Sequence, residues 1–246
     1  MMGALIKSYY AEKSGVDPAN IVSVSVMPCT AKKFECERPE MTDSGFKDVD
    51  HVLTTRELAK MIREAGIEFN ALPEEGFDSP LGAGTGAAVI FGTTGGVMEA
   101  ALRTAYEVLT GKELKKLDFE AVRGMEGIKQ ATVAVGDLPV KVAVAHGLSN
   151  AKALMEKVKA GEADYHFIEI MCCQGGCIGG GGQPVPTNSE IRKKRAEAIY
   201  REDRGLPLRK SHENPEVQEV YREFLVKPLG EKSHHLLHTH YTPRPR

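Results

Sequence analysis

The sequence contains 246 residues, of which 41% are hydrophobic and 27% are charged, and its net charge is −2. This length allows a substantial buried core in one or two compact lobes. The nearly neutral charge argues against a nucleic-acid-binding or membrane-surface protein, since either needs a concentrated basic face, and no apolar run approaches the roughly 20 residues of a membrane span.

Residues 1–13 come first and have the pattern of an amphipathic helix without a clear cap, as if the chain began inside a larger fold. They lack the apolar core and cleavage site of a secretory signal. Amphipathic periodicity predicts further helices at 54–65, 97–109, 149–160, 191–203 and 215–226. Apolar, β-branched runs predict strands at 21–27, which we expect to be buried, 141–147 and 166–171. The last residues, 233–246, predict an irregular extension.

Strands that alternate with helices predict an α/β architecture. We expect a division near residue 186, between a sheet-containing body over 1–186 and a helical tail over 187–246. Functional residues in such sheets gather beyond the carboxyl ends of the strands. The predicted strand at 21–27 runs into Cys29, and the strand at 166–171 runs into Cys172 and Cys173, so both cysteine segments occupy this kind of position.

The five cysteines are Cys29, Cys36, Cys172, Cys173 and Cys177. An odd number cannot pair completely within the chain, and nothing in the sequence indicates export. Free thiols or metal ligation are therefore expected in place of a disulfide framework, together with a reducing, cytoplasmic compartment.

The segment MCCQGGCIGGGGQP, over 171–184, carries the strongest chemical signal. Cys173 and Cys177 are four residues apart, with two glycines between them that permit backbone angles closed to other residues. The glycines at 179–182 allow the backbone to approach a bulky inorganic group and to donate amide hydrogen bonds to its sulfides. Phosphate-binding loops carry no such cysteines, and no Lys-Ser/Thr pair ends the run. An iron–sulfur cluster suits this pattern.

The segment MPCTAKKFE, over 27–35, places Cys29 after a strand and close to Lys32. A lysine beside a thiolate lowers the thiol pKa and can hold an anionic ligand. Met27 and Met171 precede the two cysteine segments in the same way and offer a polarizable lining. A single buried cysteine is more often a small core residue than a ligand, but Cys29, Cys173 and Cys177 together favour ligation.

Both segments closely resemble the second and third signature motifs of iron-only hydrogenases. The resemblance extends through HVLTTRELAKMI, IFGTTGGVMEAALRTAYE and the terminal LHTHYTPR, and so covers nearly the whole chain. It implies an iron hydrogenase-like α/β fold of mixed or parallel sheets flanked by helices, with the amino-terminal part of the domain missing. Residues 1–186 then correspond to the large-subunit catalytic region, and 187–246 to a small-subunit-like helical tail.

The resemblance also implies the cofactor and the activity. In this family a 4Fe-4S cluster shares one cysteine sulfur with a diiron unit that bears carbon monoxide, cyanide and a bridging dithiolate amine. By motif position Cys29, Cys173 and Cys177 are cluster ligands, with Cys177 as the shared sulfur. Lys32 is expected to hydrogen-bond a cyanide, and Met27, Phe91 and Met171 are expected to line the pocket. The implied reaction is the reversible splitting of dihydrogen, with ferredoxin or a similar electron carrier as partner.

The family's first signature, a TSCCP-type segment, is absent from the sequence. That segment supplies the fourth cluster ligand and a proton-transferring cysteine, so the resemblance implies that an upstream segment or a partner chain provides them. Maturation enzymes are implied as well. No CxxCxxC run for accessory clusters is present either. We therefore expect the isolated chain to be inactive.

Several residues depart from the family pattern or stand outside it. Cys172 occupies a position where relatives often carry a small residue, and we do not expect two adjacent cysteines to reach two corners of one cluster. Gln174 replaces a common proline, which affects local stiffness more than chemistry. Cys36 is expected to be a bystander. The tail histidines favour packing over a metal site, although the alternative stays open; they are His234, His235, His238 and His240.

Two other functions remain as alternatives. A hydrogenase-like iron–sulfur assembly factor shares the fold but lacks the diiron unit and usually loses the Thr-Ala that follows the first cysteine. Thr30 and Ala31 are present here, which favours the enzyme. A sensory relative is the second alternative, and the lack of an appended regulatory module argues weakly against it. The charged 191–197 stretch is interpreted as a solvated helix face in preference to a ferredoxin-docking patch.

Overall fold

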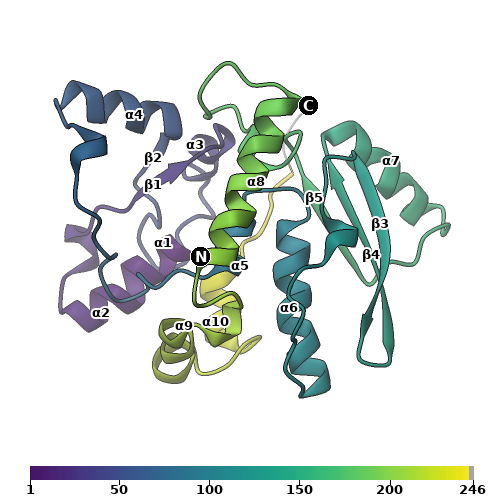
Figure 1. Cartoon of the computed structure of the whole chain (residues 1–246). Coiled ribbons are helices and arrows are strands. Elements are labelled where there is room, and N and C mark those ends of the chain that lie inside the picture. The colour runs from purple at the N-terminus through teal and green to yellow at the C-terminus, as the bar shows by residue number, and fades with distance from the viewer. Residues whose placement is uncertain (244–246) are drawn as a thin grey trace. The chain divides into compact units, whose positions relative to one another are not determined.

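The computed structural model describes residues 1–243, which fold as two compact units that do not follow chain order. Unit 1 comprises Met1–Ala83, Gly181–Pro184 and Pro215–Arg246, and unit 2 comprises Gly84–Gly180 and Val185–Asn214. Each unit combines a small sheet with helices, so the predicted α/β class is confirmed (Figure 1). Among the described residues, no helix is both long enough and apolar enough to cross a bilayer.

Unit 2 contains a three-stranded sheet in the order β3–β4–β5. The strands are β3 (Ile128–Val135), β4 (Leu138–His146) and β5 (Phe167–Met171). A tight turn at Gly136, whose φ is 61°, joins β3 to β4 as an antiparallel pair. Helix α7 (Leu148–Lys159) connects β4 to the parallel strand β5 (Figure 1). The predicted strands at 141–147 and 166–171 are therefore confirmed.

Strand β4 is apolar at successive positions because both faces of the sheet are covered. Val142 and Val144 pack into a core with α6 (Gly96–Thr110), whereas Ala143 and Ala145 pack against Leu154 of α7. Side chains alternate between the two faces of a strand, so a strand segment that is covered on both faces favours apolar residues at successive positions.

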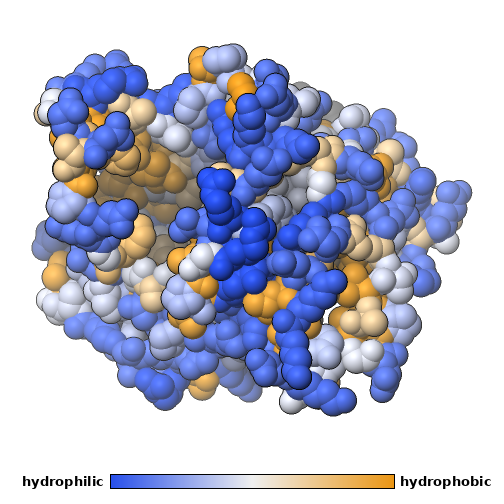
Figure 2. All heavy atoms as spheres, viewed as in Figure 1, coloured by the Kyte–Doolittle hydropathy of each residue, from blue (hydrophilic) through white to orange (hydrophobic). Residues whose placement is uncertain are grey.

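The remaining helices of unit 2 pack on one another. Helix α5 (Gly86–Ile90) contributes Ala87 and Ile90 to a core that includes Ala100 of α6 and Ile199 of α8 (Ser189–Gly205). Asn188 caps α8 by accepting a hydrogen bond from the Ile191 amide. Hydrophilic residues predominate over the outer side of α8 (Figure 2), as expected for a solvated helix face.

Unit 1 contains a parallel pair of strands, β1 (Val24–Met27) and β2 (His51–Thr54), in register from Val24 with His51 to Met27 with Thr54. Helix α4 (Thr55–Glu64) follows β2 directly. Its start is a capping box, in which the Thr54 hydroxyl accepts from the Glu57 amide at 3.2 Å and the Glu57 carboxylate accepts from the Thr54 amide at 2.8 Å. The predicted helix at 54–65 is thus confirmed.

The expectation that the strand near 21–27 is buried is wrong. Val24 and Val26 are 51% and 44% exposed, because β1 and β2 form a sheet of only two strands. Val24 and Val26 lie on the same face of β1, and this face is about half open to solvent.

A helical cluster forms the second core of unit 1. Its first part runs without interruption through α1 (Met2–Leu5), a π-helical turn (Ile6–Tyr10) and α2 (Ala11–Ser14), which confirms the predicted amino-terminal helix. Its second part comprises α9 (Pro215–Val220), a second π-helical turn (Tyr221–Leu225) and α10 (Glu231–Leu237). Tyr9, Phe224 and Leu236 meet in the core.

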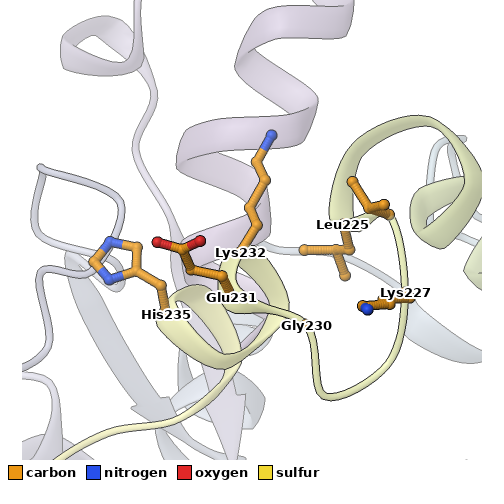
Figure 3. Close-up of a pocket in the computed structure, with 7 residues that line it drawn as sticks. Leu225, Lys227, Gly230, Glu231, Lys232 and His235 are labelled. Atoms are coloured by element: carbon orange, nitrogen blue, oxygen red, sulfur yellow. The ribbon is translucent and has the colours of Figure 1, made fainter.

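The expected irregular extension over 233–246 is wrong for residues 233–237, which belong to α10. Ser233 and Leu236 are buried there, so tertiary packing stabilises a helix that the polar, histidine-rich sequence does not suggest. Figure 3 shows α10 beside a cavity of about 470 Å³ that includes Leu225 and Lys227 among its lining residues. The last three residues of the predicted extension, 244–246, lie outside the described part of the chain.

Candidate metal centre

The segment with Cys173 and Cys177 forms a tight loop directly after β5. Met171, the last residue of β5, is paired with His146, the last residue of β4. The Gly176 amide donates to the Cys173 carbonyl at 3.0 Å, and the Gly180 amide donates to the Cys177 carbonyl at 2.9 Å. Both cysteines are half-buried. The carboxyl end of a strand therefore presents them, as the sequence predicted.

Three hydrogen bonds fix this loop to neighbouring elements of unit 2. The Gly175 carbonyl accepts from the Thr94 amide at 3.0 Å, and the Ile178 amide donates to the Gly92 carbonyl at 2.9 Å. The Gly175 amide donates to Nδ1 of His146 at 3.1 Å. The 91–96 turn and the end of β4 thus hold the loop from two sides, and the cysteines have a defined backbone.

Gly176 is required by its backbone conformation and by its surroundings. Its φ is 93°, which L side chains rarely adopt. A Cβ atom there would lie 2.7 Å from both the Thr94 nitrogen and the Met171 sulfur. The loop can pass this closely only with glycine, and the same contact places the Met171 thioether beside the turn between the two cysteines.

His146 is a functional residue that the sequence did not reveal. It is 6% exposed, and its Nε2 lies 3.2 Å from the Met125 carbonyl. Since Nδ1 accepts from Gly175, Nε2 carries the proton in this arrangement. Burial lowers the pKa of His146 below its usual value, and the nearby Lys129 acts in the same direction. The neutral form that accepts the Gly175 hydrogen bond is thereby favoured.

A buried lysine and glutamate lie beneath the 94–98 turn. The Glu169 carboxylate accepts from the Gly95 and Met98 amides, both at 2.7 Å, at the start of α6. Lys129 donates to the Gly124 carbonyl at 2.8 Å and contacts Thr94. Burial lowers the pKa of Lys129 to about 8 and raises that of Glu169. This pair supports the turn that holds the cysteine loop.

The first cysteine segment lies in unit 1, immediately after β1. Cys29 is half-buried, and Thr30 precedes the short helix α3 (Ala31–Glu35). The Pro28 carbonyl accepts from the Gly182 amide at 2.8 Å, and a Cβ atom on Gly181 would lie 3.2 Å from the Thr30 hydroxyl. Gly181 and Gly182, which themselves belong to unit 1, therefore pack on the backbone around Cys29.

The two lysines of this segment have different roles. Lys33 donates to the Val52 carbonyl at 2.8 Å and pairs with Glu57 at 2.9 Å, so it joins α3 to β2 and α4. The Lys32 ammonium forms an ion pair with Glu35 one turn further on. Lys33 thus links α3 to two other elements, whereas the Lys32–Glu35 pair is partly exposed and lies within α3. An ion pair of this kind contributes little to stability and exchanges readily.

Cys36 and Cys172 differ from the other three cysteines. Cys36 is buried, and its sulfur lies 3.2 Å from the Lys33 carbonyl. Burial and the neighbouring Glu37 raise the pKa of the Cys36 thiol, which disfavours the thiolate that a metal ligand requires. Cys172 is exposed. The environment of Cys36 disfavours a ligand role, whereas the expectation that Cys172 is not a ligand stays a prediction.

The predicted site residues therefore fall into two groups. Met27, Cys29 and Lys32 lie together in unit 1, and Met171, Cys173 and Cys177 lie together in unit 2. Phe91 also belongs to unit 2, where it is 45% exposed at the end of α5.

The donor set fits an iron–sulfur cluster. All five cysteines are thiols and none forms a disulfide. Thiolate ligands on glycine-rich loops, with backbone amides nearby, are the protein groups that such clusters use.

Two clusters of acidic residues in unit 2 have the spacing of metal sites but hold cations of the protein. Glu99, Asp118 and Asp203 have ligand atoms within 4.8 Å of one another. Arg103 forms a bidentate pair with Asp203, with both distances 2.8 Å, and binds Glu99 at 2.7 Å. Arg123 and Arg209 neutralise the remaining charge. This network is structural.

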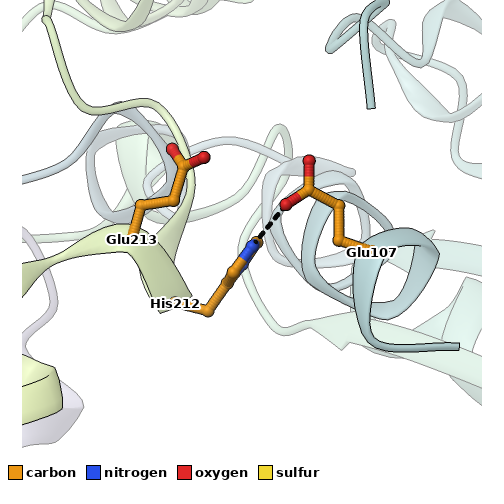
Figure 4. A group of neighbouring side chains, drawn as sticks. All are labelled: Glu107, His212 and Glu213. Atoms are coloured by element: carbon orange, nitrogen blue, oxygen red, sulfur yellow. Dashed lines mark hydrogen bonds and ion pairs between the residues drawn. The ribbon is translucent and has the colours of Figure 1, made fainter. Parts of the chain in front are cut away.

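The second cluster consists of Glu107, His212 and Glu213 (Figure 4). Nε2 of His212 lies 2.8 Å from the Glu107 carboxylate, and the Lys210 ammonium binds both Glu107, at 2.7 Å, and Glu213, at 2.8 Å. An ammonium group already occupies the position between the carboxylates. We therefore assign this cluster to the packing of residues 210–213 on α6.

Comparison with protein families identifies the chain. The family model described as "Iron only hydrogenase large subunit, C-terminal domain" matches residues 1–181, and "Iron hydrogenase small subunit" matches residues 189–244. The chain belongs to the iron-only hydrogenase family. The resemblance that the sequence motifs indicated is thus confirmed.

Hydrogenases from several organisms are similar to this chain. It is 59% identical over 247 residues to the NADP-reducing hydrogenase subunit HndD of Solidesulfovibrio fructosivorans, covering 100% of this chain and 42% of that protein. It is 46% identical to iron hydrogenase 1 of Clostridium pasteurianum, over 98% of this chain and 43% of that protein. A periplasmic relative from Nitratidesulfovibrio vulgaris is 58% identical over 81% of this chain.

Solved structures agree with the fold. A variant of the [FeFe]-hydrogenase HydA1 from Chlamydomonas reinhardtii has a TM-score of 0.80 and 46% identity, over 98% of this chain and 68% of that chain. The present chain spans less than half the length of the first two curated relatives. A cytosolic iron–sulfur assembly component of Rattus norvegicus is also similar, at 32% identity over 98% of this chain.

Proposed function

We propose that this chain is part of an iron-only hydrogenase that catalyses the reversible oxidation of dihydrogen to protons and electrons. The observation that carries the proposal is the cysteine loop after β5. This loop presents two cysteines at the end of a strand, requires glycine at position 176, and is held by hydrogen bonds to the 91–96 turn and to His146. These features and the family membership of the chain support the same function. The large-subunit catalytic region is proposed to span 1–186, followed by a small-subunit-like tail over 187–246.

Cys29, Cys173 and Cys177 are proposed to hold a 4Fe-4S cluster, with Cys177 as the sulfur shared with a diiron subcluster. Each of these cysteines follows the carboxyl end of a strand, Cys29 after β1 and Cys173 and Cys177 after β5, which supports the ligand assignment. When bound, the diiron unit with its carbon monoxide, cyanide and bridging dithiolate amine supplies the heterolytic hydrogen chemistry.

The protein's own groups anchor this cofactor and control its surroundings. Lys32 is proposed to exchange its partly exposed ion pair with Glu35 for a hydrogen bond to a cyanide ligand, which a compact ammonium donates well. Met27, Met171 and Phe91 are proposed to line the pocket and to exclude water. The Met171 sulfur already lies beside the turn between Cys173 and Cys177.

The fourth cluster ligand is proposed to come from a TSCCP-type segment outside these residues, in an upstream segment or a partner chain. Maturation enzymes would install the diiron unit, and ferredoxin or a similar carrier would exchange electrons. The five thiols favour a reducing, cytoplasmic compartment, although one relative is periplasmic.

A second candidate function is a non-enzymatic iron–sulfur assembly protein. The similarity to the cytosolic iron–sulfur assembly component of Rattus norvegicus favours it. The higher identity to hydrogenases, and the presence of Met27, Thr30, Ala31 and Met171, favour the enzyme.

Anaerobic reconstitution with iron and sulfide tests the ligand assignment. We expect the visible sulfur-to-iron charge-transfer absorption and the iron bound per chain to fall in Cys29→Ser, Cys173→Ser and Cys177→Ser. Cys172→Ser and Cys36→Ser are matched controls that should bind iron as the parent chain does. Equal iron binding by all five variants would refute the assignment.

A further inference from the structure

A second group of side chains that could bind a metal surrounds a cavity in unit 1, and most of them belong to residues 229–240. The cavity has a volume of about 470 Å³ and is lined by Asp43, Leu229, Gly230, Glu231, His234, His235, His238 and His240. Six of these eight residues carry imidazole or carboxylate groups. Four of the eight histidines of the chain are gathered here, more than the packing of one short helix requires.

Two pairs of these residues are four positions apart, one pair within α10 and the other at its end. Glu231 and His235 lie on α10, whereas His238 directly follows the helix and its amide donates to the His234 carbonyl at 3.2 Å. Glu231 and His235 project to the same side of the helix, whereas Lys232 points away from them (Figure 3). The rings of His234 and His238 are stacked, with centroids 4.6 Å apart and an interplanar angle of 13°. Histidines separated by four residues on a helix have the spacing that lets two imidazoles bind one ion.

The backbone that presents these side chains is fixed on several sides. The Ser233 hydroxyl donates to the Lys227 and Gly230 carbonyls, both at 2.9 Å, and anchors the start of α10. The His240 carbonyl accepts from the buried Arg38 guanidinium. The Asp43 amide donates to the Asp48 carboxylate at 3.3 Å. Residues from α10, from the segment after it and from the 42–48 turn thus face one cavity.

The imidazole side chains themselves are available for ligation. All four are exposed, and within residues 1–243 no hydrogen bond or ion pair engages their ring nitrogens. The ring nitrogens do not yet lie close enough together to share an ion. Within the described chain, only the two acidic clusters of unit 2 have three ligand atoms within 4.8 Å of one another. Binding an ion therefore requires rotation about χ1 and χ2, which exposed side chains make between staggered rotamers.

We propose that this cavity binds one divalent transition-metal ion through His234 and His238, with further ligands from His240 or His235 and from Asp43. Imidazole nitrogen suits Zn²⁺, Ni²⁺ and Cu²⁺, whereas Mg²⁺ and Ca²⁺ prefer oxygen ligands alone. A bound ion would tie the end of α10 and the following segment to the 42–48 turn. This site is independent of the proposed hydrogenase function and serves to fasten the tail of unit 1.

Titration of the full chain with Zn²⁺ by calorimetry tests this site. The cysteines also bind Zn²⁺, so the comparison is between chains that share them: the parent, the double variant His234→Gln/His238→Gln, and the control His51→Gln. His51 is exposed and belongs to the same unit but lies outside the cavity. We expect the parent and the control to bind one more ion than the double variant, or to bind that ion at least about tenfold more tightly.

A second measurement keeps the proposal testable if the isotherms overlap. Zn²⁺ should slow proteolytic cleavage between residues 226 and 243 in the parent and in His51→Gln, and should have no such effect in the double variant. Circular dichroism should show all three folded alike, since the replaced side chains are exposed. Identical Zn²⁺ binding and protection in all three chains would overturn the proposal, as would equal protection by Mg²⁺.

Discussion

Replacing His146 with phenylalanine should loosen the cysteine loop without removing a cysteine. An aromatic ring is kept, but the buried Gly175 amide loses its acceptor, 3.1 Å away, and the Met125 carbonyl loses a partner at 3.2 Å. An unsatisfied buried amide costs about 1–3 kcal/mol. We therefore expect a local loss of ~2 kcal/mol, which corresponds to a roughly thirty-fold change in the local opening equilibrium.

Hydrogen exchange followed by mass spectrometry measures this opening directly. Peptides that cover 172–180 should exchange roughly thirty-fold faster in His146→Phe than in the parent chain at the same pH. His166→Phe is the matched control, because His166 accepts a hydrogen bond from the Lys141 amide at the opposite end of the same strand pair. Unchanged exchange over 172–180 would refute the role of His146 in holding the loop.

The same residue predicts a dependence on pH. Burial lowers the folded-state pKa of His146 below the usual value of about 6.5. The unfolded chain then binds this proton more readily than the folded chain, so the contribution is complete above about pH 6.5 and is lost as the pH falls toward the folded-state pKa. The urea midpoint should drop more between pH 7.5 and 5.5 in the parent than in His146→Phe. If the urea midpoint fell equally in both chains, His146 would not contribute to the loss of stability at low pH.

Three further predictions concern the same unit. Gly176→Ala forces a Cβ atom to within 2.7 Å of the Thr94 nitrogen at a φ of 93°; it should lower reconstituted iron severalfold, and iron binding at the parent level would contradict it. Asp203→Asn leaves the fully buried Arg103 without its bidentate partner. It should lower the free energy of unfolding, measured with urea, by about 3–5 kcal/mol, and a loss of less than about 1 kcal/mol would contradict the importance of this network. Cys172→Ala should change neither iron content nor the urea midpoint, because the side chain is exposed.

The sequence predicted β4 and β5, the two strands next to the second cysteine segment. It did not predict β3, in which polar and apolar residues are mixed, or the short strand β2. Strand β4 has an unbroken apolar run at 142–145 because helices cover both of its faces there. Strand β3 mixes polar and apolar residues without a regular period in IKQATVAV, and β2 has only four residues, so neither stood out. Strand β1 was recognised from its valines, but its exposure was not, because burial depends on which other elements cover the sheet.

The cysteine ligands were predictable because their residue types carry chemistry at a distinctive spacing. The residues that hold the loop were not, because each partnership joins distant positions. His146 and Gly175 are 29 residues apart, and Arg103 and Asp203 are 100 apart. Nothing in the local sequence distinguishes His146 from a surface histidine. Its place as the last residue of β4, opposite Met171, becomes informative only when the pairing of the strands is known.

Infrared spectroscopy in the carbonyl and cyanide region tests the central claim most directly. The chain would be co-expressed with hydrogenase maturation enzymes, once alone and once with a TSCCP-containing segment supplied upstream or in trans. We predict that bands of metal-bound carbon monoxide and cyanide appear only when that segment is present, and that they disappear in Cys177→Ser. An iron-loaded chain without such bands under both conditions, or bands that survive Cys177→Ser, would contradict a hydrogenase centre held by these cysteines.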